Sequence, residues 1–207
     1  MSDTLARRER QALCDTALQL GPAAPTCCEG WDARRLVAHL LVRERSPWAV
    51  GLAVPPLSSR TERAMDAWSR QELATLVDRL RTPAPWLLGP VDSAINTTEF
   101  FVHHEDLRRA QPGWEPRALA AADEETLWRH LTLAGRAMVR PAGVPVVAVR
   151  DDGRRAVLRR GEDPVVLTGR ASELVLLLFD RPSVDVALEG MDEPVRRFRA
   201  TFDRLRP

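Results

Sequence analysis

The sequence predicts an α+β protein, in which an all-helical part is followed by a smaller part of strands and helices. Up to about residue 141, apolar residues recur at intervals of three and four, as in amphipathic helices. After Pro141-Ala142-Gly143, short runs rich in β-branched residues alternate with turn sequences, which is typical of strands. We therefore expect one domain over residues 1–141 and a second, α+β domain over residues 142–207.

Five segments of the first part have helical spacing, and their ends carry helix-stop or helix-start residues. Gly21-Pro22 and Ser46-Pro47 end the first two segments, since proline cannot continue a helix. Asp32 is a good N-cap residue for the second, and Pro90 suits the first position of the fourth. The expected helices are 3–20, 33–45, 61–81, 90–110 and 116–139.

The second part is expected to contain four strands and two helices. Asp151-Asp152-Gly153 lies between two β-branched runs and predicts a hairpin. The apolar run 171–180 and the amphipathic run 192–205 predict helices. The expected strands are 144–149, 155–158, 165–168 and 184–188.

Composition excludes several classes of partner. The net charge of +1, from 30 basic and 29 acidic residues, gives no reason to expect a nucleic acid or an anionic membrane. We see no signal peptide and no membrane-spanning run, so the expected location is the cytoplasm. All basic residues other than histidine are arginine, which suggests a GC-rich bacterial genome.

The three cysteines predict no disulfide framework; Cys27-Cys28 are either a redox or metal-binding pair or two reduced thiols before a helix.

A candidate metal site lies on the fourth helix. Glu99 and His103 are four residues apart and share a face, and His39 on the second helix can complete a three-residue ligand set. Asn96 and Asp106 extend the same polar stripe on an otherwise apolar helix. Residue spacing leaves two alternatives open: Glu99 forms a salt bridge with an arginine, or His39 is a hydrogen-bonded core residue.

Neighbouring polar residues receive separate expectations. Arg43 lies one turn after His39 and is a candidate for binding an anionic substrate, or else a surface residue. His104 is rotated about 100° from His103 and is therefore not expected to bind the same metal. The cysteines are also expected to lie away from the ligands, because Cys27-Cys28 come before the His39 helix and about two turns from His39 along its axis.

These stretches resemble the mycothiol-dependent maleylpyruvate isomerase family, part of the DinB-like superfamily of metal-binding four-helix bundles. The N-terminal match runs through Gly30-Trp31-Asp32, then 36–40, and then 99–106. A weaker match over 169–178 resembles the family's C-terminal domain, which is related to sterol-carrier domains. The resemblance implies an actinobacterial protein with an up-down four-helix bundle followed by a small sterol-carrier-like α+β domain.

The resemblance also implies the ligands and the cofactors. His39, Glu99 and His103 would hold a divalent metal, with zinc expected and nickel or iron as alternatives. Mycothiol would be the thiol cosubstrate, and the partner a small electrophile that is transferred or isomerised. The second domain, of about 65 residues, is short for binding such a substrate. The alternative is a non-catalytic metal-binding or stress-related interaction protein, and a monomer and a homodimer are equally compatible with the sequence.

Overall fold

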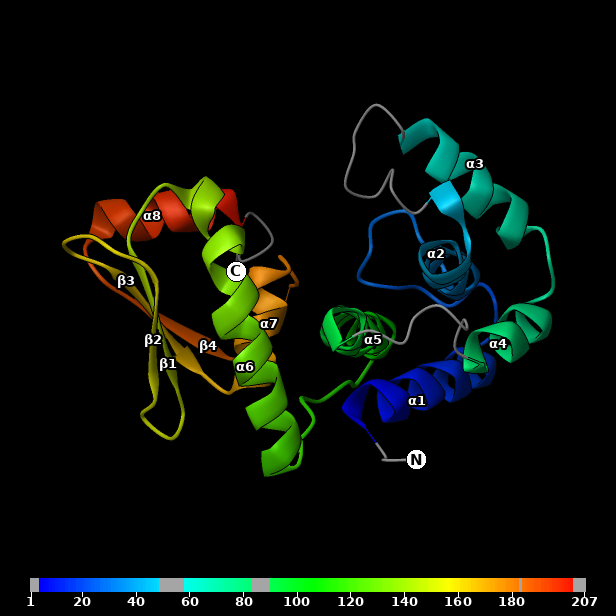
Figure 1. Ribbon diagram of the computed structural model, residues 1–207, viewed down its shortest axis with the longest axis horizontal. Coiled ribbons are helices and arrows are strands. Elements are labelled where there is room, and N and C mark those ends of the chain that lie inside the picture. Colours follow the sequence, from blue (N-terminus) through cyan, green and yellow to red (C-terminus); the bar gives the residue numbers. More distant parts are fainter. Residues whose placement is uncertain (1–3, 49–57, 83–89, 183, 203–207) are drawn as a thin grey trace. The chain divides into compact units, whose positions relative to one another are not determined.

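The computed structural model describes residues 4–48, 58–82, 90–182 and 184–202 of the 207-residue chain. This described part contains eight α-helices and one four-stranded mixed sheet, which confirms the α+β class (Figure 1). The chain divides into two compact units, Met1–Trp114 and Glu115–Pro207. This division lies earlier than the expected boundary at residue 141, because helix α6 (Ala121–Met138) packs against α7 (Ala171–Leu178) and strand β2 (Arg155–Arg159).

The first unit is helical. Its helices are α1 (Leu5–Leu20), α2 (Ala33–Arg45), α3 (Ser58–Ser69), α4 (Leu73–Arg81) and α5 (Pro90–Arg109). Helix α1 packs against α4 and α5, and α2 packs against α3 and α4. Asp32 caps α2 as expected, because its Oδ1 accepts a hydrogen bond from the Arg35 backbone N–H at 2.8 Å. The core between the helices is mainly aliphatic, with Leu13, Leu36, Leu40, Leu76 and Leu80, and it also contains Phe100.

The prediction of one helix over residues 61–81 is wrong, because the helix breaks between α3 and α4. Glu72 adopts an extended conformation, and the Ser69 hydroxyl donates back to the Met65 carbonyl at 2.8 Å. The break lets the two helices bury different faces. All four large apolar residues of α4 are buried, whereas α3 buries only Thr61 and Met65. Tertiary packing therefore overrides a continuous helical pattern here.

Helix α5 is buried on most of its sides, and its polar residues therefore need partners. Glu105 pairs with Arg109 at 2.7 Å and with Arg108 at 2.9 Å. His104 donates to or accepts from Glu9 of α1 through Nδ1 at 2.8 Å, and its Nε2 lies 3.1 Å from the Thr16 hydroxyl. These contacts fix the rotation of α5 and so fix the direction of Glu99 and His103 on its opposite side.

The second unit contains the sheet, in the order β2-β1-β3-β4. Strands β1 (Val146–Arg150) and β2 form the predicted antiparallel hairpin, β1 and β3 (Val165–Gly169) are parallel, and β3 and β4 (Val186–Glu189) are antiparallel. Helix α7 is buried along its whole length. The amphipathic α8 (Asp192–Thr201) contributes Phe198, whose ring lies 4.6 Å from that of Phe202.

Three expected helices of the second unit are shorter in the structure, among them α7, which ends at Leu178 rather than at 180, and one short helix was not expected. Helix α6 begins at Ala121 rather than at 116, and α8 ends at Thr201, with residues 203–207 outside the described part. A single 3-10 turn, η3 (Arg140–Ala142), follows α6 and is closed by Gly143 with φ of 68°. Among the described residues, no helix has the length and apolarity needed to cross a membrane.

Candidate metal centre

The three predicted ligands meet between α2 and α5. Glu99 Oε2 lies 3.5 Å from His103 Nε2 and 3.8 Å from His39 Nε2. One donor atom from each of the three residues lies within 4.8 Å of the others. The four-residue spacing on α5 gives the Glu99–His103 pair, and the packing of α2 brings His39 to it, with its ring centroid 5.0 Å from that of His103.

His39 provides the observation that distinguishes a metal site from ordinary core packing. Its side chain is buried, yet neither Nδ1 nor Nε2 has a hydrogen-bond partner among the residues that the structure describes. A buried polar group without a partner is costly, so such a group needs an explanation. Ligands bound tetrahedrally to zinc at about 2.0–2.1 Å lie roughly 3.3 Å from one another. The separations of 3.5 and 3.8 Å are too long for good hydrogen bonds and close to that ligand spacing.

The electrostatics of the cluster favour a charged Glu99 and a neutral His39. Burial lowers the pKa of His39, which keeps the imidazole neutral as a metal ligand requires. Burial alone would raise the pKa of Glu99, but His103, His39 and the Arg43 guanidinium outweigh it and hold that pKa well below its usual range. Burial likewise opposes the charging of His103, but the hydrogen bond with Asp106 and the nearby Cys28 and Glu99 side chains raise its pKa well above the ordinary value.

A second cluster lies on the other side of the His103 ring. Asp106 Oδ2 is 2.9 Å from His103 Nδ1 and accepts a hydrogen bond from the Cys28 thiol at 3.2 Å. Cys28 Sγ lies 3.9 Å from the same ring nitrogen. These three residues also satisfy the distance criterion for a metal site. Their short contacts are hydrogen bonds, however, so they already satisfy one another, whereas His39 has no such partner.

The expectation that the cysteines lie away from the ligands is therefore wrong for Cys28. The loop before α2 folds back onto α5, where the Cys27 backbone N–H donates to the Asp106 carbonyl at 3.0 Å. At the same end, the Gln111 side chain donates to the Pro25 carbonyl at 3.0 Å. Distance along the chain gave no sign of this contact. The one usable signal was Asp106 itself, which follows His103 by three residues in the same polar stripe.

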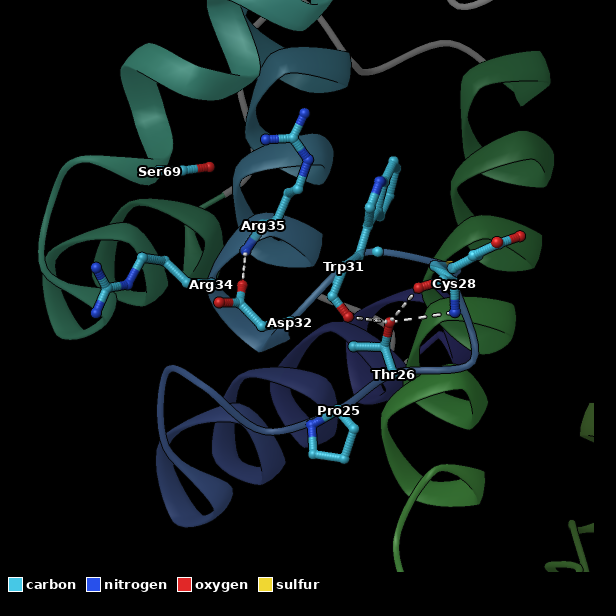
Figure 2. A pocket seen from close by; sticks show the side chains of 10 residues that line it. Pro25, Thr26, Cys28, Trp31, Asp32, Arg34, Arg35 and Ser69 are labelled. Atoms are coloured by element: carbon cyan, nitrogen blue, oxygen red, sulfur yellow. Dashed lines mark hydrogen bonds between the residues drawn. The ribbon is translucent and has the colours of Figure 1, made fainter.

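The same loop places the Trp31 ring beside the two histidines. Figure 2 shows Trp31 projecting between α2 and α5, with the Thr26 hydroxyl tying the loop to its own backbone. The Trp31 ring centroid lies 4.9 Å from that of His39 and 6.4 Å from that of His103. Trp31 thus lies against the His39 ring and near the His103 ring, where it limits their movement.

Arg43 lies beside the carboxylate and not on the surface. Its Nε is 3.5 Å from Glu99 Oε2, its Nη1 donates to the Asn96 side-chain oxygen, and its side chain is only 15% exposed. The arginine partner considered for Glu99 is therefore present, in addition to the two histidines. Glu99 itself retains 21% exposure, against 7% for His103. Glu99 is thus the most exposed of the three candidate ligands.

Comparisons with known proteins support the fold. No protein-family model matches the sequence, and no curated protein matches it. A crystal structure of the mycothiol-dependent maleylpyruvate isomerase superposes with a TM-score of 0.63 at 17% identity, covering 89% of this chain and 90% of that chain. A histidine-to-alanine mutant of that isomerase gives a TM-score of 0.62 at 16% identity, covering 88% and 90%. At such identities the similarity establishes the fold alone.

Proposed function

We propose that this protein binds one divalent metal, zinc in the first instance, through His39, Glu99 and His103, and that it activates a low-molecular-weight thiol for reaction with a small electrophile. The reaction is the transfer of the thiol to the electrophile or the thiol-assisted isomerisation of a double bond. Two findings support the proposal: the donor atoms of the three residues converge, and a mycothiol-dependent isomerase shares the fold over most of both chains. Mycothiol is the proposed thiol.

The observation that carries the proposal is the unpartnered His39. A neutral imidazole facing a carboxylate at 3.8 Å, with both ring nitrogens buried and unbonded, is unfavourable without a cation between them. Two imidazoles and one carboxylate leave further coordination positions open, as catalytic sites do. Nickel and iron accept the same donors, so the donor set alone does not distinguish them from zinc.

Each residue near the site has a proposed part. His39 and His103 supply neutral nitrogens, and Asp106 holds the His103 ring through Nδ1. Arg43, on the more exposed side, binds an anionic group of the thiol or of its acceptor. Trp31 limits movement of both rings and excludes water from their other side. A metal bound there would lower the pKa of a coordinated thiol so that it is a thiolate at neutral pH.

The test is calorimetry with mycothiol, or with a cysteinyl amide as its surrogate, on zinc-loaded and metal-free protein. We expect clear binding to the loaded protein and much weaker binding to the metal-free protein. The double variant Cys27→Ser/Cys28→Ser should behave in the same way, since the thiol is supplied from outside. Cys14 needs no substitution, because it is fully buried and burial raises the pKa of its thiol to about 12.

Incubation of the loaded protein with thiol and a panel of electrophiles, followed by mass spectrometry, then tests the reaction. Formation of a thiol conjugate or an isomerised product by wild type, and not by His39→Ala, supports the proposal. Equal thiol binding with and without metal would reject thiol activation. Tight zinc binding without any reaction would leave the non-catalytic metal-binding protein as the better description.

A further inference from the structure

Cys28 lies at the Nδ1 side of the His103 ring, away from the proposed metal position, and the proposed function assigns it no role. Its thiol donates to Asp106 Oδ2 at 3.2 Å, and the same oxygen lies 2.9 Å from His103 Nδ1. The other nitrogen of that ring, Nε2, faces Glu99 at 3.5 Å. A continuous series of contacts therefore leads from the Cys28 thiol through Asp106 and His103 to the proposed metal position.

Because Asp106 is buried, its hydrogen bond with the Cys28 thiol affects how its carboxylate is held. Asp106 is only 1% exposed, so its carboxylate depends on protein donors for its solvation. Both the imidazole Nδ1 and the thiol S–H contact the same oxygen, Oδ2, so the thiol helps to hold that oxygen against the His103 ring. A carboxylate that accepts from the non-ligating nitrogen fixes the tautomer and the orientation of a ligating histidine.

The backbone keeps Cys28 in place independently of its thiol. The Cys27 N–H donates to the Asp106 carbonyl, and the Cys28 N–H donates to the Thr26 hydroxyl at 3.1 Å. Substitution of the Cys28 side chain therefore removes the S–H donor while these loop contacts remain. The effect of the thiol on His103 can thus be separated from the folding of the loop.

We propose that the Cys28 thiol is a positioning group for the metal centre, which acts through Asp106 to orient His103. This inference rests on the proposed metal site. It assigns a function to a cysteine without making it a ligand or a nucleophile. It predicts that the hydrogen-bond donor, rather than the sulfur, is what the site requires.

The experiment compares wild type with Cys28→Ala, Cys28→Ser and the neighbouring control Cys27→Ser. Zinc affinity is measured by competition with a chromophoric chelator, and the cobalt-substituted proteins are compared by visible absorption. Cys28→Ala should bind zinc about tenfold more weakly, the lower end of the range for outer partners of a ligand. Its cobalt spectrum should also change. Cys28→Ser should recover affinity to within about threefold, since its hydroxyl is also a donor. Cys27→Ser should match wild type.

Each contrary outcome has a distinct meaning. If Cys28→Ala matches wild type in affinity and spectrum, the inference is overturned and the metal site stands. If Cys28→Ser is as weak as Cys28→Ala, donor positioning is overturned in favour of a requirement for sulfur. A sulfur-to-cobalt charge-transfer band that is present in wild type and lost in Cys28→Ser would show that Cys28 is a ligand. That result would also overturn the inference. If wild type binds neither metal, the proposed function itself fails. Thermal unfolding of each metal-free variant shows whether a loss of affinity is only a loss of fold.

Discussion

His103 has two ring nitrogens with two different environments, and this division organises the candidate site. Nδ1 contacts the carboxylate of Asp106, and Nε2 faces Glu99 and His39. His104, the next residue, points to α1, where Glu9 and Thr16 occupy both of its nitrogens. Two adjacent histidines on one helix therefore have separate environments, one at the candidate metal site and one in the packing of α1 on α5.

This difference gives a matched pair of substitutions. His103→Ala should lose most of the bound zinc, because it removes one of three proposed ligands. His104→Ala should keep the metal but lower the free energy of unfolding by about 1–3 kcal/mol, since it leaves Glu9 buried without its partner. Metal analysis of the purified proteins and urea unfolding measure the two effects. Loss of metal in His104→Ala, with full retention in His103→Ala, would contradict the assignment.

The raised pKa of His103 predicts proton release on metal binding. The raised pKa of His103 favours the protonated ring in the metal-free protein, whereas a ligating imidazole must be neutral. Zinc binding should therefore release about one proton, and the affinity should rise as the pH rises towards that pKa. Calorimetry in buffers of different ionisation enthalpy counts the protons. No release near pH 7 would mean that His103 is already neutral or is not a ligand.

At the scale of the elements, local signals predicted starts and turns better than they predicted breaks. The Asp32 cap, the Pro90 start and the hairpin at 151–153 depend on a few neighbouring residues and agree with the structure. The break between α3 and α4 and the fold-back of the loop before α2 depend on packing against distant helices. The grouping of α6 with the sheet unit was missed for the same reason.

One contact between elements is open to a direct stability test. Glu124 of α6 accepts hydrogen bonds from the Ser172 backbone N–H at 2.9 Å and from the Ser172 hydroxyl at 2.7 Å, at the start of α7. It thus caps α7, whose own N-cap residue, Arg170, makes no side-chain cap. Glu124→Ala should lower the free energy of unfolding by about 1–2 kcal/mol, the usual value of a lost cap. Glu124→Gln, which keeps an acceptor, should lose less. Equal unfolding midpoints for all three proteins in urea would contradict the capping role.

At the scale of the whole molecule, the fold is better established than the chemistry. The similarity to the isomerase extends over 89% of the chain at 17% identity, so it supports the architecture and not the activity. The up-down bundle, the sterol-carrier-like second domain and the actinobacterial origin remain predictions. The convergence of the three side chains was predictable in part, because Glu99 and His103 share a helix face and the resemblance to the isomerase family added His39. The position of Cys28 beside Asp106 was not predictable, since it depends on how a loop folds.

The central claim is the position of the metal, and anomalous scattering from a crystal grown with zinc tests it most directly. The account predicts one peak per chain, bonded to a ring nitrogen of His39, a carboxylate oxygen of Glu99 and Nε2 of His103, with Nδ1 of His103 still on Asp106. A peak bounded instead by Cys28, His103 Nδ1 and Asp106, or no peak between α2 and α5 at saturating zinc, would contradict it.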